Sequence, residues 1–100
     1  TNLTPYDDDA YSVAIAPDGK IVAAGLAGNN GQASRFGVVR YLVNGTRDTT
    51  FGGDGIVTTH VSPQIDSAFG VAVQPDGSVV ASGNADAGGD PAFAVLRYQP

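Results

Sequence analysis

The chain has 100 residues, 42% of them hydrophobic, and a formal net charge of −5 at pH 7. This length suits one small domain, which on folding buries about 60–65% of the surface of its unfolded chain. No apolar run approaches the roughly 18 residues that a membrane span needs. The five basic residues form no cluster that would bind a nucleic-acid backbone. We therefore expect neither membrane insertion nor nucleic-acid binding.

All ten acidic residues are aspartates, and the chain has no cysteine. Aspartate forms hydrogen bonds to nearby backbone in turns, whereas glutamate is a good helix former. The composition therefore predicts a turn-rich chain with little helix and with neither disulfides nor thiolate metal sites.

The first predicted strand is residues 10–16, where larger and smaller side chains alternate as in a strand with two different faces. The segment Pro17–Gly19 predicts a tight turn, because proline presets φ, aspartate accepts turn hydrogen bonds and glycine takes a positive φ. The apolar run 20–25 is then the second strand of a hairpin.

The third predicted strand is residues 35–43, followed by a turn at Asn44–Gly45 and a fourth strand at residues 55–61. Each strand is joined to the next by a short connection or a polar loop. The sequence therefore predicts a four-stranded antiparallel meander.

This pattern of predicted strands and turns occurs twice in the sequence. Residues 10–25 recur at 68–83 with nine identities in sixteen positions, and Phe36–Tyr41 recurs as Phe93–Tyr98. We assign residues 1–58 to a first repeat, with residues 1–3 aligned to the end of a fourth strand. Residues 59–100 form a second repeat that lacks its outer strand.

Sheets with small residues on one face and branched or aromatic residues on the other stack face to face, and a closed ring of such sheets is a β-propeller. We expect an all-β fold of two four-stranded antiparallel propeller blades, the second without its outer strand. The ring would be completed either by oligomerisation or by a longer parent chain.

Three stretches, "DDAYSVAIAPDGKIVAAG", "FGVVRY" and "DTTFGGDGIVTT", closely resemble the bacterial delta-60 repeat family, whose function is not settled. The resemblance implies blades of a propeller in a secreted or cell-surface bacterial protein. We expect no cofactor, with calcium as the alternative.

Two arginines, Arg40 and Arg97, recur inside apolar strands. An unpaired charge in a stacked-sheet core would cost several kcal/mol. We therefore expect structural ion pairs with the equivalent aspartates Asp8 and Asp66, with anion binding as the alternative.

Calcium is the one metal that the sequence suggests. Asp7 and Asp9 point the same way in an extended chain and are candidate ligands, although the second repeat has Ile65 and Ser67 at these positions. The segment Gly52–Gly55 is better explained as a turn before the fourth strand.

Catalysis has little support, because the chain has no cysteine and a single histidine. We expect no enzyme, although a propeller-type glycoside hydrolase or lyase using aspartate carboxylates stays an alternative. A non-catalytic interaction or scaffold module is the main prediction, and a purely structural spacer is another alternative.

The loops at 26–35 and 84–92 differ between the repeats, so packing does not constrain them, and recognition residues are often on such loops. A glycan or protein ligand is expected at this end of the blades. The candidate contacts are Asn29, Asn30, Gln32, Arg35, Asp86 and Asp90.

Two blades leave two apolar faces of roughly 350 Å² each uncovered, by strand spacing and rise. Together they exceed the patch of about 300–600 Å² usual for a soluble monomer. We expect a homo-oligomer in which two, three or four chains close a head-to-tail ring, with residues 1–3 beside the open edge of the preceding chain.

Overall fold

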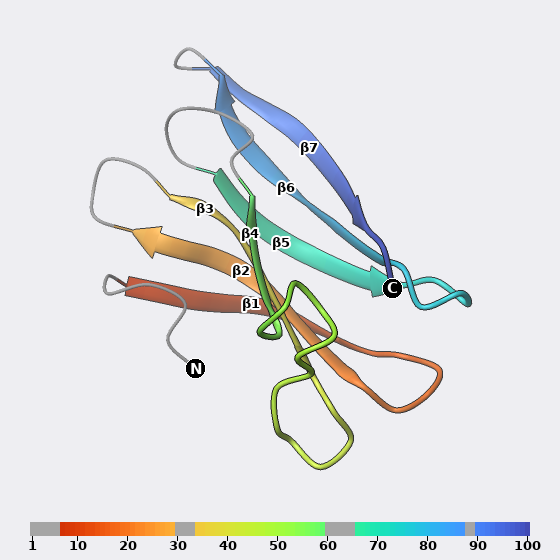
Figure 1. The fold of residues 1–100 in the computed structure, drawn as a ribbon. Coiled ribbons are helices and arrows are strands. Elements are labelled where there is room, and N and C mark those ends of the chain that lie inside the picture. The colour runs from red at the N-terminus through yellow and green to blue at the C-terminus, as the bar shows by residue number, and fades with distance from the viewer. Residues whose placement is uncertain (1–6, 30–33, 60–65, 88–89) are drawn as a thin grey trace.

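The computed structural model describes residues 7–29, 34–59, 66–87 and 90–100. In these residues it contains no helix and two antiparallel sheets, with strand orders β1-β2-β3-β4 and β5-β6-β7 (Figure 1). The strands are β1 (Asp7–Ile15), β2 (Ile21–Asn29), β3 (Arg35–Tyr41), β4 (Ile56–Thr59), β5 (Asp66–Val73), β6 (Val79–Ala87) and β7 (Asp90–Tyr98). The predicted all-β architecture is confirmed. Since the described residues include no helix, no helical segment among them could cross a bilayer.

The hairpins β1–β2 and β5–β6 close through the predicted Pro-Asp-Gly turns. Gly19 and Gly77 have φ of 89° and 90°, in the left-handed region that favours glycine. In the first turn Oδ1 of Asp18 accepts a hydrogen bond from the backbone N–H of Lys20 at 3.1 Å. Proline, aspartate and glycine thus act together to reverse the chain, as predicted.

The connection from β3 to β4 is longer than predicted. β3 ends at Tyr41, and a turn with Gly45 at φ 90° returns the chain so that Arg47 bridges Tyr41. A second excursion then ends where the backbone N–H of Arg40 donates to the carbonyl oxygen of Gly55 at 2.9 Å. The Asn44–Gly45 turn therefore does not lead directly into the fourth strand.

Both first strands carry a bulge at the same repeat position. The register of β1 on β2 shifts across Tyr11, and that of β5 on β6 shifts across Phe69. The two rings lie side by side, with centroids 5.3 Å apart. The bulges therefore align an aromatic side chain from each repeat along the same edge of the two sheets.

Each sheet has two faces, which we name after their most distinctive side chains. The tyrosine face comprises Val13, Ile15, Ala23, Val39 and Tyr41 in the first sheet and Val71, Val73, Ala81, Leu96 and Tyr98 in the second. The arginine face comprises Val22, Ala24, Phe36, Val38 and Arg40 in the first sheet and Val80, Ser82, Phe93, Val95 and Arg97 in the second.

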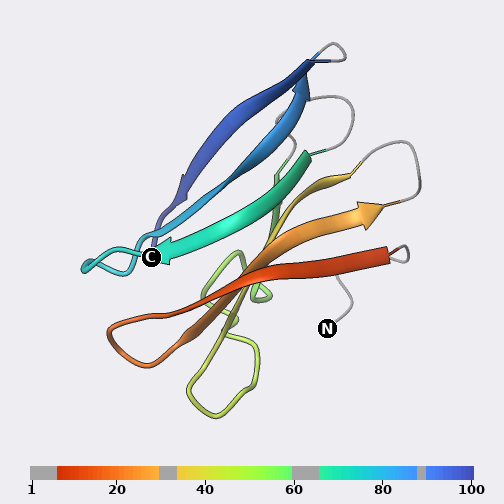
Figure 2. The ribbon, with the colours of Figure 1, turned by 180° about the vertical axis from the view of Figure 1, so that it is seen from behind.

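The two sheets stack as separate layers (Figure 2). The arginine face of the first packs on the tyrosine face of the second. Phe36 and Val38 are buried in one cluster with residues of the second sheet, among them Ala81. At the margin, the hydroxyl oxygens of Thr59 and Tyr98 lie 2.7 Å apart. The predicted face-to-face stacking is confirmed.

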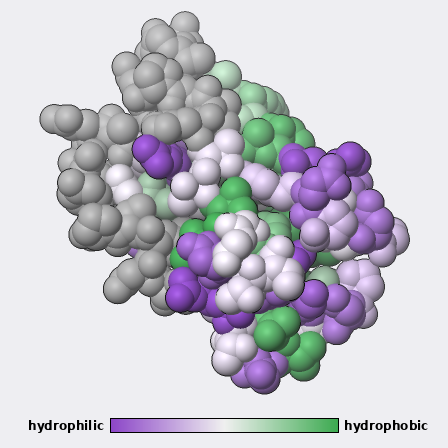
Figure 3. Space-filling view, viewed as in Figure 1, coloured by the Kyte–Doolittle hydropathy of each residue, from purple (hydrophilic) through white to green (hydrophobic). Residues whose placement is uncertain are grey.

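No described sheet covers the other two faces, although Val39 on the tyrosine face of the first sheet is buried. On the tyrosine face of the first sheet Val13 and Ile15 are 63% and 65% exposed, and on the arginine face of the second sheet Phe93 and Val95 are 91% and 64% exposed. Figure 3 shows apolar side chains (green) reaching the surface among polar ones (purple). The described residues therefore leave one face of each kind exposed at opposite sides of the stack.

Candidate functional site

The most densely connected charges lie at the end of β3, around the buried side chain of Arg40. Its Nε donates to Oδ2 of Asp48 at 3.0 Å, and its Nη2 lies 3.4 Å from Oγ1 of Thr50. The guanidinium carbon is 4.6 Å from the centre of the Phe51 ring, within cation–π range. We call these four residues, together with Lys20, the arginine cluster.

Asp48 holds the cluster together through both of its carboxylate oxygens. The hydroxyl and the backbone N–H of Thr50 donate to Oδ1 at 2.6 and 3.1 Å, while the backbone N–H of Asp48 donates to the carbonyl of Arg40 at 2.9 Å. The Thr50 hydroxyl, with smaller help from Lys20 and Arg40, holds the pKa of Asp48 well below its usual range despite burial, which acts to raise it. Asp48 is therefore a poor general base near neutral pH.

Lys20 adds a second cation on the same carboxylate. Its Nζ lies 3.1 Å from Oδ2 of Asp48 and 3.7 Å from Oδ2 of Asp18. Since Arg40 reaches the same Oδ2 atom, strand β3, the residue just before β2 and the loop after β3 are tied to one buried anion. The arrangement suits a structural lock that orders the loop.

A cavity of about 330 Å³ lies beside the cluster, between the Pro-Asp-Gly turns of the two repeats. Its lining combines prolines with charged groups, and includes Pro17, Asp18, Lys20, Arg40, Thr50, Pro75, Asp76 and Gly77. The backbone N–H of Ser78 is the main cause of a lowered pKa at Asp76. The lining has carboxylates but neither histidine nor cysteine, so it offers a polar pocket without a nucleophile paired to a base.

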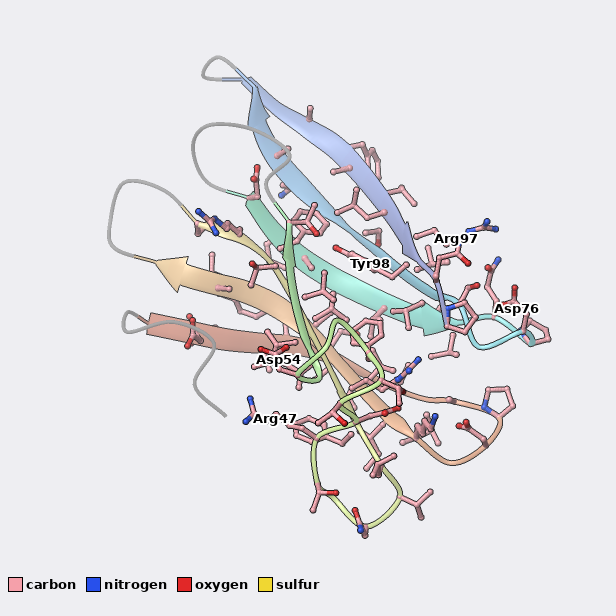
Figure 4. All side chains as sticks on the ribbon, in the orientation of Figure 1. Arg47, Asp54, Asp76, Arg97 and Tyr98 are labelled. Atoms are coloured by element: carbon pink, nitrogen blue, oxygen red, sulfur yellow. The ribbon has the colours of Figure 1, made fainter. Side chains whose placement is uncertain are left out.

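Arg97, the counterpart of Arg40, is exposed (Figure 4). The prediction that it is buried in an ion pair within the sheet stack is wrong, because no described segment covers the arginine face of the second sheet. Its charge makes a small contribution to the lowered pKa of Asp76. Arg97 therefore lies in solvent at the turn end of β7.

The predicted partner of Arg40 is also wrong. Arg40 pairs with Asp48, and Oδ1 of Asp8 accepts a hydrogen bond from the backbone N–H of Gly28 at 3.0 Å. Arg40 lies in register with Ala14 across β2, and Asp8 is about 20 Å further along β1 at 3.3 Å per residue. The two side chains belong to opposite ends of the sheet.

Asp66 has a different position from the one predicted. It is completely buried where the second repeat begins, and its backbone forms two hydrogen bonds with Ser34. The hydroxyl of Ser34 donates to the carbonyl of Asp66 at 2.9 Å, and the N–H of Asp66 donates to the carbonyl of Ser34 at 3.2 Å. This reciprocal pair fastens the start of β5 to the first sheet.

The predicted ligand end lies opposite the Pro-Asp-Gly turns, where β2 and β6 end and β3, β5 and β7 begin (Figure 1). Arg35 is exposed there at the first position of β3. The loops are shorter than predicted, because backbone pairing extends β2 to Asn29 and joins Asp86 to Pro91 and Ala87 to Asp90. Asn30 and Gln32 lie outside the described residues.

The calcium candidates do not form a cluster in the part of the chain that the structure describes, which holds no group of three or more potential metal ligands. Asp7 and Asp9 lie in β1, and Asp9 is exposed. Near β4, Oδ1 of Asp54 accepts a hydrogen bond from the N–H of Ile56 at 3.0 Å, between glycines with positive φ. The segment Gly52–Gly55 is therefore a turn, as predicted.

Sequence reasoning missed Asp48, Phe51 and the cavity at the turn end. Comparing the two repeats singled out Arg40 because it recurs, but Asp48 falls in a stretch that occurs only once in this chain. The available signal was the motif "DTTF", whose aspartate and second threonine are spaced for a side-chain turn.

A family model described as a domain of unknown function (DUF5122) beta-propeller matches residues 16–51 and 74–100. The two matched segments begin at equivalent positions of the two repeats and together cover more than half of the chain. A search of curated proteins and a search of solved structures found no match. The match confirms the resemblance to a propeller-type repeat family of unknown function.

Proposed function

Because this chain belongs to the DUF5122 β-propeller family, we propose that it is a non-catalytic interaction or scaffold module of a bacterial surface or secreted protein. The proposal includes membership of the delta-60 repeats, because the chain contains "DDAYSVAIAPDGKIVAAG", "FGVVRY" and "DTTFGGDGIVTT". The observation that carries it is the stacking of two equivalent sheets through unlike faces. Such stacking builds a rigid support in which the β2–β3 and β6–β7 connections of the two sheets lie at the same end.

The charges of the arginine cluster support a non-catalytic role. Arg40, Lys20 and Asp48 are engaged with one another, and the low pKa of Asp48 removes it as a proton acceptor near pH 7. A hydrolase would need two carboxylates about 5–10 Å apart across a substrate site, one of them with a raised pKa. Asp48 and Asp76 line or adjoin the cavity between the turns, and the pKa of each is lowered, the opposite of what a general acid needs.

The loop end is the proposed binding surface, for a glycan or a protein. Arg35 is exposed at this end, and the strand ends of both repeats gather there. Loops on a rigid scaffold commonly carry recognition residues. The alternative is a structural spacer without any ligand.

A glycan array probed with the purified chain, run beside a panel of glycoside hydrolase and lyase substrates, tests the proposal. We expect binding without turnover, weakened by Arg35→Ala. The matched control is Arg47→Ala, because Arg47 is also exposed but lies beyond the other end of β3. Turnover of any substrate would refute the non-catalytic role, and equal binding by both variants would move the ligand away from the loop end.

A further inference from the structure

The tyrosine face of the first sheet contains a hollow of about 170 Å³. Small residues leave this space, and its lining includes Ala10, Ala23, Gly25, Gly37, Val39 and Tyr41, together with Asp8 and Asp9. An apolar cavity of about 150 Å³ is large enough to hold benzene. The hollow therefore has the size to accept one phenyl ring, which would pack against its alanine and glycine residues.

The same position in the second sheet shows what fills such a hollow. Its small residues Ala68, Ala81 and Ala94 correspond to Ala10, Ala23 and Gly37, and they form one buried cluster with the ring of Phe36. Phe36 comes from the arginine face of the first sheet and is completely buried. Within the chain, a phenylalanine on an arginine face thus packs among the small residues of a tyrosine face.

Phe93 is the counterpart of Phe36 in the second repeat, and it is 91% exposed. It lies on the uncovered arginine face beside Val95, on the side of the stack opposite the hollow. One chain therefore presents both a projecting ring and a hollow for such a ring, on surfaces that face away from each other.

We propose that Phe93 of one copy inserts into the hollow around Ala23 and Gly37 of a second copy, so that the chains stack head to tail. Over the three strands that the two sheets share, the outer faces carry the kinds of side chain that already pack together inside the chain, whereas Phe51 and Val57 of the internal interface have no counterpart in the second sheet. A contact between copies would thus continue the established interface between the sheets.

The charges agree with this arrangement. Inside the chain, Arg40 shares the cavity between the turns with Asp76 of the next sheet. The same superposition brings Arg97 to Asp18 of the second copy, which is the counterpart of Asp76. The contact uses different surfaces on the two partners, so it repeats until a ring of two, three or four chains closes. It does not depend on the ligand proposed at the loop end.

Light scattering coupled to size exclusion, at about 10–100 μM chain, tests the proposal. We expect a mass of two, three or four times 10.1 kDa. Phe93→Lys removes the phenyl group that inserts, and Ala23→Phe fills the hollow. Each variant should give the mass of one chain. Val43→Lys is the matched control, because Val43 is 70% exposed but lies in the loop after β3, and it should leave the mass unchanged.

Mixing the two variants gives the decisive result. The Ala23→Phe chain keeps the side chain of Phe93, and the Phe93→Lys chain keeps an open hollow. Equimolar mixing should therefore give a species of two chains. A parent chain of 10.1 kDa throughout this range would overturn the proposal. If like faces pair instead, one of the two variants keeps the mass of the parent, and this result would also overturn the proposal. Circular dichroism checks folding, and Val13→Lys replaces Ala23→Phe if that variant does not fold.

Discussion

Replacing Arg40 and Arg97 separately by alanine compares the same residue at equivalent positions of two repeats. Among the described residues, Arg40→Ala leaves the buried carboxylate of Asp48 with Lys20 as its one cationic partner, and it removes the contact over Phe51. Breaking a buried ion pair by deleting one partner costs about 3–5 kcal/mol. Because Lys20 remains, we expect a loss near 3 kcal/mol. Arg97→Ala changes an exposed side chain and should cost less than about 0.5 kcal/mol.

Thermal unfolding followed by far-UV circular dichroism measures both losses. A domain of this size loses about 4–8 °C in Tm per kcal/mol, so Arg40→Ala should lower the Tm by about 12–24 °C and Arg97→Ala by less than about 4 °C. Both changes are made in the Phe93→Lys background, so that association between chains does not contribute. Similar Tm values for the two variants would refute the reasoning that burial and the loop after β3 distinguish these arginines.

Three further outcomes follow from the described contacts. Hydrogen bonds from Thr50 lower the pKa of Asp48 below the unfolded value of about 3.9. The ionised carboxylate therefore stabilises the fold above about pH 4, and this stability is lost as the pH falls. Acid unfolding of Asp48→Asn should lack that part of the loss. Tyr98→Phe removes the hydrogen bond to Thr59 between the sheets and should cost about 1 kcal/mol in urea unfolding, whereas Tyr11→Phe, at a side chain that is 50% exposed, should cost less. Gly77→Val places a β-branched residue at a φ of 90° and should lower the Tm by several degrees, whereas Ala72→Val on an exposed strand position should not.

The hairpins and the sheet stacking could be predicted because short-range chemistry determines them. The sequence Pro-Asp-Gly reverses a chain wherever apolar alternation flanks it, and Gly19 shows the expected positive φ. The stacking followed from strands that are apolar on both faces. These features depend on residues that are neighbours in the sequence, so a single segment of the sequence is enough to predict them.

The ion pairs could not be predicted, because they depend on which side chains come together after the chain has turned twice. Asp48 is only eight positions from Arg40, yet it reaches the guanidinium only because the Asn44–Gly45 turn returns the chain across Tyr41. Asp8 and Asp66 recur at equivalent positions, but recurrence marks a shared backbone position and does not identify a partner. Strand ends were also misjudged, since polar residues such as Asp86 pair through backbone groups without any apolar alternation.

The two unlike faces of each sheet also affect how such a protein can grow. When a gene segment encoding one sheet is duplicated in tandem, the new sheet already carries a surface complementary to that of its parent, so no mutations are needed to create the contact. The energy of each added sheet then comes largely from its neighbours, as in other repeat proteins whose stability is a sum of unit and nearest-neighbour terms. A substitution on a buried face such as that of Phe36 would therefore weaken one junction and leave the more distant junctions intact.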